Sequence, residues 1–346
     1  MNSPTLLVRA DASVASGTGH VMRCLALAQA WQDAGGRVVF VMAECLPQIQ
    51  NRLQANSVEV VPIQVEPGTT EDSQRTFETA GLSRSDWVVV DGYRFSAAYQ
   101  HALKSSGLKV LFLDDNAHCD YYWADLVLNQ NPYADPALYA NRSSETRLLV
   151  GLKYALLRRE FRRFAAWQRS IPAVALKVLI TLGGTDGGNF TLRVLQALPS
   201  IALSGLKVRV AVGGGNPHVP SLQHWISDCS QDIELLADVS DMAEQIAWAD
   251  VGVAAAGTVS WEICSLGLPS LMVATAENQI AAAKEMSRRE AAVVVRPDLS
   301  SEELGAQLQG LMLSQEERKQ LSSNARYMLD TDGSGRVVEA ILGSSG

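Results

Sequence analysis

Strand-like apolar runs alternate with helical patterns through most of this 346-residue chain. The alternation is typical of parallel sheets, because parallel neighbours need long crossover connections that are usually helices. In the first half the runs fall near 5–10, 37–43, 58–63, 87–91, 109–113 and 125–129. In the second half they fall near 176–182, 207–212, 233–236, 251–255, 270–274 and 292–296. The sequence therefore predicts an α/β protein with two open parallel sheets.

The length indicates two domains, since it is about twice the usual size of one. A basic, helix-like stretch ends at Ile171-Pro172 before a new strand, where proline disfavours a continuing helix. We therefore predict a linker helix over 158–172, between Rossmann-like domains over 1–157 and 173–346. The last helix of the second domain is expected to pack back on the first. Two such domains would face a central cleft, the usual ligand position in this class.

Composition excludes several classes of function. A net charge of −8 argues against nucleic acid as a partner. The five cysteines form no Cys-x-x-Cys pair, which fits reduced thiols in a cytoplasmic protein. We see no signal peptide and no apolar stretch long enough to span a membrane. The expected protein is a cytoplasmic monomer.

The most distinctive turn covers 17–23, between the first strand and a helix expected over 21–34. A glycine-rich turn in this position commonly serves a phosphate. Here it reads Gly-x-Gly-x-x-Met, with His20 and Arg23 where a dinucleotide site carries small residues. The pattern favours a reactive edge over a nicotinamide cradle. Locally, His20 could instead cap the helix, and Arg23 could either balance substrate charge or pair internally.

The second half carries further glycine turns at strand ends. Those at 183–188 and 213–216 would let backbone approach a ligand, and the first leads into a helix whose N–H groups could hold a phosphate. Each is equally compatible with a simple tight turn. The segment 254–269 is more specific, because a small-residue turn starts a helix and Glu262 falls one turn in. The N–H groups at the start of this helix suit a diphosphate. The Glu262 carboxylate could accept hydrogen bonds from a ribose diol, or it could only interact with the helix dipole.

These patterns carry a family resemblance. Residues 256–262, 267–269 and 278–279 resemble the UDP-sugar half of GT-B-fold proteins such as the MurG glycosyltransferases. Residues 9–13, 17–24, 91–93, 114–115 and 182–186 resemble the PseG hydrolases of pseudaminic acid biosynthesis, which remove UDP from UDP-2,4-diacetamido-2,4,6-trideoxy-β-L-altropyranose. The resemblance spans nearly the whole chain in order. Its departures are Ala254–Ala256, where some relatives have a serine, and a loosely specified approach at 14–16.

The resemblance implies a GT-B-like fold and a metal-independent, inverting hydrolase in which His20 activates water. Its product would feed flagellin glycosylation or a surface polysaccharide. UDP is already a good leaving group, so neither a metal nor a cofactor is expected. The acidic cluster 114–120 suggests a metal site at first sight, yet adjacent side chains at a strand end diverge and cannot converge on one ion.

Further residues complete the expected site, which takes a small UDP-sugar. Tyr93 could donate to a sugar or phosphate oxygen, and Asp11 could orient His20 or hold an acetamido N–H. Either residue could equally be structural. Catalytic roles are predicted for His20 (general base), Asp11 and Tyr93. Substrate contacts are predicted for Gly17, Gly19, Arg23, Gly183, Gly184, Gly257, Thr258, Glu262, Asn278 and Gln279.

Two other functions fit the same patterns. A MurG-like glycosyltransferase would use the same donor half, although a lipid-acceptor enzyme should show an apolar and basic membrane-facing patch, and basic residues are sparse in the first domain. A two-lobed sugar-binding module would not need the titratable His20. Release of UDP without an added acceptor would distinguish the hydrolase from the transferase.

Overall fold

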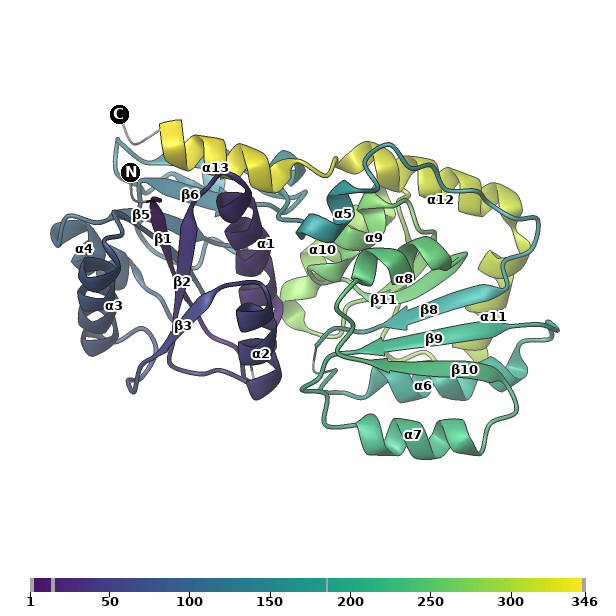
Figure 1. Cartoon of the computed structure of the whole chain (residues 1–346). Helices are drawn as coiled ribbons and strands as arrows, with labels where there is room; N and C mark the ends of the chain where they lie inside the picture. Colours follow the sequence, from purple (N-terminus) through teal and green to yellow (C-terminus); the bar gives the residue numbers. More distant parts are fainter. Residues whose placement is uncertain (1–2, 14–15, 185, 344–346) are drawn as a thin grey trace. The chain divides into compact units, whose positions relative to one another are not determined.

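A computed structural model describes residues 3–13, 16–184 and 186–343. The chain divides into two compact units. Unit 1 comprises Met1–Arg159 with Thr331–Gly346, and unit 2 comprises Glu160–Asp330. Each unit is an open parallel sheet with helices, so the predicted α/β class with two Rossmann-like sheets is confirmed (Figure 1).

Among the described residues of unit 1, seven parallel strands lie in the order β3-β2-β1-β4-β5-β6-β7. Their bounds are β1 Thr5–Ala10, β2 Arg37–Met42, β3 Glu59–Pro62, β4 Trp87–Asp91, β5 Lys109–Leu113, β6 Leu126–Asn129 and β7 Arg147–Val150. The helices are α1 Gly19–Asp33, α2 Pro47–Ala55, α3 Thr70–Ser83, α4 Ala97–Ser105 and α13 Gly333–Gly343, with short 3₁₀ turns at Pro136–Tyr139 and Leu152–Tyr154.

The sheet of unit 1 is apolar on both faces because helices cover both. Leu6 and Val8 of β1 belong to a core shared with α1 and α13, whereas Leu7 between them belongs to a core shared with α4. Figure 1 shows α1 and α2 on one side of the strands and α3 and α4 on the other. This two-sided burial explains why the strands read as continuous apolar runs.

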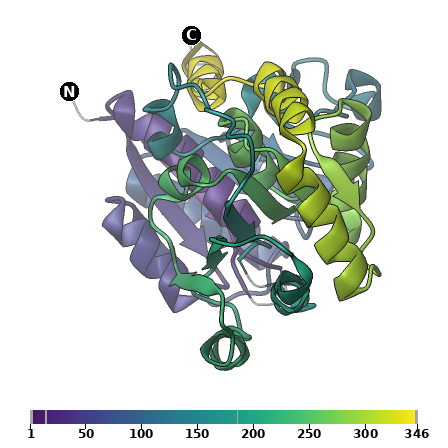
Figure 2. The same ribbon diagram turned by 90° about the vertical axis from the view of Figure 1, so that its right-hand side faces the viewer.

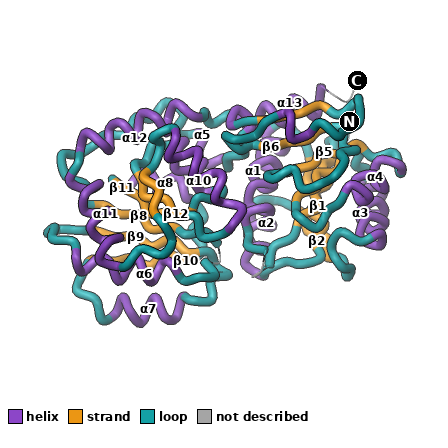
Figure 3. Tube along the Cα trace, turned by 180° about the vertical axis from the view of Figure 1, so that it is seen from behind, coloured by secondary structure: helices purple, strands orange, loops and turns teal. Residues whose placement is uncertain are grey.

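Among the described residues of unit 2, six parallel strands lie in the order β10-β9-β8-β11-β12-β13. The strands are β8 Lys177–Thr181, β9 Lys207–Val212, β10 Asp232–Ala237, β11 Val251–Ala255, β12 Ser270–Val273 and β13 Val293–Val295. The helices are α5 Arg159–Arg162, at the boundary of the units, then α6 Phe190–Ala197, α7 Val219–Ser227, α8 Met242–Trp248, α9 Val259–Ser265, α10 Ile280–Arg288, α11 Ser301–Leu313 and α12 Gln315–Met328, with 3₁₀ turns at Leu198–Ser200 and Glu277–Gln279. The yellow-green helices α11 and α12 follow one another in Figure 2, and Figure 3 shows the strands from behind.

Strand order reverses once in each sheet. In unit 1 the chain runs outward from β1 to β3 on one side and from β4 to β7 on the other, so the reversal lies between β1 and β4. In unit 2 it lies between β8 and β11. Loops at the carboxyl ends of such strand pairs part in opposite directions, which makes these two edges the expected ligand positions.

Two local predictions need correction, one for a helix and one for a strand. The expected linker helix over 158–172 is helical only at Arg159–Arg162. The Arg169 guanidinium beyond it donates to the carbonyls of Ile246 and Leu266, so tertiary hydrogen bonds hold this segment in a non-helical path. Strand β7 was not predicted, because its four residues begin with an exposed arginine. In the described part of the chain, no helix is both long and apolar enough to cross a membrane.

Candidate active site

The glycine turn places His20 in the first turn of α1, at the reversal point of the unit 1 sheet. Gly17 has a φ of +75°, a conformation that glycine adopts without strain, and its N–H donates to the Ser13 carbonyl at 2.9 Å. Helix α1 begins two residues later, and Thr18 at its N-cap makes no side-chain capping bond. The turn therefore presents His20 at the carboxyl edge of β1. Within this turn, residues 14–15 lie outside the described residues.

Tyr93, which follows β4, packs against His20. The ring centroids are 4.9 Å apart and the planes make an angle of 80°, an edge-to-face contact. Tyr93 is 42% exposed, whereas His20 is half-buried. Among the described residues, neither ring nitrogen of His20 has a hydrogen-bond partner. The structure thus brings together two of the three predicted catalytic residues and leaves the imidazole available to a ligand.

Arg23 is buried and fixed between two carboxylates. Its Nε and Nη2 donate to Asp91 at 2.7 Å each, and its Nη1 donates to both oxygens of Asp115 at 2.7 and 2.8 Å. The side chain is only 5% exposed. Of the two roles open from the sequence, the geometry favours internal pairing over a direct contact with substrate charge.

Asp115 is the centre of a polar cluster that includes two residues absent from the sequence-based site. Besides Arg23, it accepts from Asn131 Nδ2 at 2.8 Å and from the Tyr93 hydroxyl at 3.1 Å. Burial alone would raise the pKa of Asp115, but the charge and hydrogen bonds of Arg23, with the His20 charge and the Asn131 hydrogen bond, together lower it to about 2. Tyr133, two residues beyond Asn131, is half-buried, and burial followed by the Asp115 charge raises its pKa. No motif marks Asn131 or Tyr133 in the sequence.

The neighbouring Asp114 points elsewhere, as expected for adjacent residues at a strand end. It accepts from the backbone N–H of Asn116 and Ala117 and from the Tyr122 hydroxyl, and it pairs with His118 Nδ1 at 3.3 Å. Burial lowers the pKa of His118, yet its interactions with Asp114 and Cys119 together outweigh burial and raise the value to about 10. His118 is therefore charged near neutral pH and unsuited to act as a base there.

Of the roles open to Asp11 from the sequence, its contacts favour the structural one, and a contact with an acetamido N–H stays a prediction. Its Oδ1 accepts from Arg9 Nη1 and from the backbone N–H groups of Ala43 and Glu44, at 2.7 to 3.0 Å. Arg9 is fully buried and also forms two hydrogen bonds of 2.8 Å to Asp72. Asp11 thus holds the loop after β2, and no described hydrogen bond joins it to His20.

In unit 2, the predicted diphosphate turn lies at the reversal point of the sheet. Gly257 and Thr258 lead from β11 into α9, where Thr258 makes no side-chain capping bond. A Cβ added to Gly257 would lie 3.5 Å from Nε2 of Gln279, so these two predicted residues meet. Gln279 is held by Thr275, whose N–H and hydroxyl donate to its Oε1 at 2.9 and 3.2 Å. Glu262 is half-buried in α9, and Asn278 is exposed.

The glycine turn after β8 differs from the prediction. The Asp186 carboxylate accepts from the N–H groups of Phe190 and Thr191 at 2.9 and 2.8 Å, so a side chain already fills the expected phosphate position at α6. That part of the prediction is wrong. Contacts of the ligand with Gly183 and Gly184 remain predictions, and Thr185 of this turn lies outside the described residues.

The adjoining turn after β9 contains polar groups that sequence reasoning missed. A Cβ on Gly213 would come within 2.3 Å of the Gly184 carbonyl oxygen, so the two turns touch. Asn216 is 6% exposed and accepts from the His218 N–H, while its Nδ2 and the His218 Nε2 are buried without a partner in the described structure. Buried polar atoms are rarely left unpaired, so these two nitrogens can form further hydrogen bonds.

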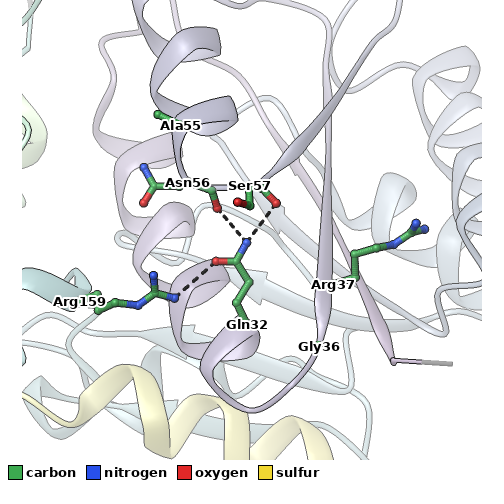
Figure 4. Close-up of a pocket in the computed structure, with 7 residues that line it drawn as sticks. All are labelled: Gln32, Gly36, Arg37, Ala55, Asn56, Ser57 and Arg159. Atoms are coloured by element: carbon green, nitrogen blue, oxygen red, sulfur yellow. Dashed lines mark hydrogen bonds between the residues drawn. The ribbon is translucent and has the colours of Figure 1, made fainter. Parts of the chain in front are cut away.

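A cavity of about 410 Å³ opens at the opposite edge of the unit 1 sheet (Figure 4). Its lining includes Arg37 at the start of β2 and Ser57 just before β3, which places it at the amino ends of strands. Figure 4 shows the Gln32 amide at its centre, where Nε2 donates to the carbonyls of Asn56 and Ser57. Because this amide is already bonded and the edge is not the usual ligand side, we place the active site elsewhere.

The second half of the chain matches a known domain family. Residues 178–336 match the glycosyltransferase family 28 C-terminal domain. The matched residues include the turns at Gly183, Gly257 and Gln279.

The resemblance to the PseG hydrolases is confirmed as a similarity of sequence. The chain is 27% identical over 244 residues to the UDP-2,4-diacetamido-2,4,6-trideoxy-β-L-altropyranose hydrolase of Campylobacter jejuni, covering 69% of this chain and 80% of that protein. It is also 27% identical over 239 residues to the spore coat polysaccharide biosynthesis protein SpsG of Bacillus subtilis, covering 67% and 68%. The structure of MurG from Acinetobacter baumannii matches with a TM-score of 0.64 and 19% identity, over 99% of this chain and 100% of that one. The chain therefore has a GT-B-type fold.

Proposed function

We propose that this protein is a UDP-sugar hydrolase that releases UDP from UDP-2,4-diacetamido-2,4,6-trideoxy-β-L-altropyranose. The observation that carries the proposal is His20, which lies at a sheet reversal point with both ring nitrogens unpaired in the described structure and Tyr93 packed edge-on beside it. Similarity to the Campylobacter hydrolase, which extends over both units, supports the sugar. The reaction belongs to pseudaminic acid biosynthesis, a supply route for surface glycans.

In the proposed reaction, His20 takes a proton from a water molecule that attacks the anomeric carbon. A new bond forms between that carbon and the water oxygen, and the bond from the carbon to the diphosphate oxygen breaks, with inversion. UDP leaves with the bonding electron pair. The proposal assigns nucleotide binding to unit 2, where the N–H groups near Gly257 and Thr258 and the Gln279 amide stabilise the departing charge.

A second histidine, His118, lies at the same sheet edge as His20 and strengthens the assignment of His20 as the base. His118 carries a proton at neutral pH because Asp114 stabilises its charged form. A base must be able to accept a proton, and its efficiency is greatest when it is unprotonated at the working pH. Among the described residues, no carboxylate is hydrogen-bonded to His20, and Asp115 interacts with it only through its charge.

A glycosyltransferase is the second candidate, favoured by the likeness to the MurG fold and by the family 28 domain. The two functions differ in the nucleophile, which is water in one and an acceptor hydroxyl in the other. A time course followed by NMR with the diacetamido UDP-sugar, without added acceptor, separates them. A hydrolase releases UDP and free sugar, and the first anomer formed is the inverted one. A strict need for an acceptor would favour the transferase.

Replacement of His20 by asparagine tests the base directly. We expect His20→Asn to lower turnover by about 10²-fold or more, the usual contribution of general base catalysis, while calorimetry finds UDP binding unchanged. His118→Asn serves as the matched control, and its turnover should stay closer to that of the unmodified protein. In ¹⁸O-labelled water the label should enter the sugar. Label in UDP, or loss of UDP binding by a folded His20→Asn variant, would refute the mechanism.

A further inference from the structure

The turn that carries Tyr93, residues 92–95, packs directly on the loop between β3 and α3. Gly68 in that loop has a φ of +83°, and a Cβ added to it would lie 2.1 Å from the Arg94 carbonyl oxygen and 2.9 Å from the carbonyl carbon. This obstacle is backbone, which cannot rotate aside as the end of a flexible side chain can. Glycine at position 68 therefore allows the Tyr93 turn to lie where it does.

A buried ion pair holds both Gly68 and the Tyr93 turn. The Gly68 N–H donates to Asp72 Oδ2 at 2.8 Å, and Arg9 Nε and Nη2 donate to the same carboxylate at 2.8 Å each. Neither side chain of this pair is exposed. The guanidinium carbon of Arg9 also lies 5.1 Å from the centroid of the Phe95 ring, in the Tyr93 turn. Asp72 thus fixes the loop, and Arg9 packs on the turn.

The value of the Arg9–Asp72 pair lies in geometry more than in stability. The cost of burying two charges can exceed their mutual attraction, so such a pair is weak evidence for stability. Its hydrogen bonds nevertheless fix the groups that share them, because breaking one leaves a buried charge unpaired. Arg9 also donates to Asp11, which holds the loop after β2. Two loops and the Tyr93 turn therefore depend on one buried guanidinium.

We propose that Arg9, Asp72 and Gly68 are positioning residues that set the Tyr93 ring against His20. They act through the backbone of the Tyr93 turn. The edge contact between the two rings, with centroids 4.9 Å apart, restrains the orientation of the imidazole. The effect on catalysis rests on the proposed function, since a base that is misplaced by even a small distance loses rate.

The position of the Tyr93 ring can be read from His20 itself by NMR. An aromatic ring shifts the resonances of protons beside it, and the imidazole of His20 packs against the Tyr93 ring. In protein labelled with ¹³C-histidine, His20→Asn identifies the His20 resonance, and Tyr93→Leu gives its position without the aromatic ring. The limiting shifts of the unprotonated imidazole are compared, so that a change in protonation does not enter.

Gly68→Ala is the principal variant. We expect its His20 resonance to move most of the way toward that of Tyr93→Leu, and its kcat on the diacetamido UDP-sugar to fall about tenfold or more, with UDP affinity unchanged by calorimetry. Gly107→Ala is the matched control, because Gly107 has a similar φ of +91° but a Cβ there meets open space. It introduces comparable backbone strain, and it should leave both the resonance and kcat unchanged.

Asp72→Asn is a second variant that should move the His20 resonance in the same direction, because one amide N–H group replaces an acceptor of Gly68 or Arg9. If the resonance stays in place in the variants that fold, or if both fail to fold while Gly107→Ala folds, the inference is overturned. Turnover of the unmodified protein reports separately on the proposed hydrolysis. A displaced resonance without hydrolysis would refute the function and keep the positioning role, whereas hydrolysis without displacement would do the reverse.

Discussion

Each ionisable residue at the edge of unit 1 has a role set by its partner. Asp114 and Asp115 are adjacent in sequence, yet one pairs with His118 and the other with Arg23. His20 and His118 both lie near Tyr93, with ring centroids 4.9 and 5.9 Å from it. Because Asp114 pairs with His118, we assign His118 a structural role and His20 the role of base.

The His118–Asp114 pair predicts a loss of stability in alkaline solution. The folded pKa of His118, about 10, lies above the ordinary value near 6.5. The stabilisation is therefore complete below about pH 6.5 and is lost as the pH rises through 10. Between pH 7 and 9.5 we expect the free energy of unfolding in urea to fall by about 3 kcal/mol more than in His118→Gln. Parallel pH curves for the two proteins would contradict this assignment.

Sequence patterns could locate His20 and Tyr93 but not the cluster that orients them. Both follow apolar strands, so their place at one edge follows from parallel pairing of β1 and β4. By contrast, Arg23 and Asp115 are 92 positions apart, and neither Asn131 nor Tyr133 carries a periodic or motif signal. Such partners depend on side-chain direction in the folded chain. For the same reason, the bond from Asp11 to the loop after β2 was not foreseen.

Among the elements, the strands were predicted most closely, because burial on both faces leaves a continuous apolar run. The ranges 207–212 and 251–255 coincide with β9 and β11. Where tertiary hydrogen bonds determine the path of the backbone, the local sequence pattern predicted the wrong structure. The guanidinium of Arg169, for example, donates to carbonyls at the carboxyl ends of α8 and α9, and the chain there leaves the helical path.

The contact between the turns after β8 and β9 predicts a selective effect on nucleotide binding. A methyl group at Gly213 would clash with the Gly184 carbonyl, whereas one at Gly187 meets open space. Gly213→Ala should displace the first turn and weaken UDP binding about tenfold, since overpacking a close contact commonly costs about 1–3 kcal/mol. Gly187→Ala, in the same pair of turns, should bind UDP within about twofold of the unmodified protein. Equal affinities measured by calorimetry would show that this contact does not shape the nucleotide site.

At the scale of the whole molecule, the chain leaves unit 1 near Arg159 and returns to it at Thr331. The returning helix α13 supplies Val337, Val338 and Ile341 to the core that covers one face of the first sheet. Gly333 fits closely at its start, where a Cβ would lie 2.2 Å from the Ala155 carbonyl oxygen. Unit 1 is therefore incomplete without the C-terminal helix.

This return path predicts that α13 stabilises unit 1 without contributing to nucleotide binding. Ile341 is fully buried, while its neighbour Leu342 is 47% exposed. Ile341→Ala should lower the unfolding free energy of unit 1 by about 2–4 kcal/mol, and Leu342→Ala by less than about 0.5 kcal/mol. Hydrogen exchange of the α1 amides should quicken in the first variant only. Both variants should keep their affinity for UDP, because the residues assigned to the nucleotide belong to unit 2, which has a core of its own. Loss of UDP binding in folded Ile341→Ala would show instead that the two cores are energetically coupled.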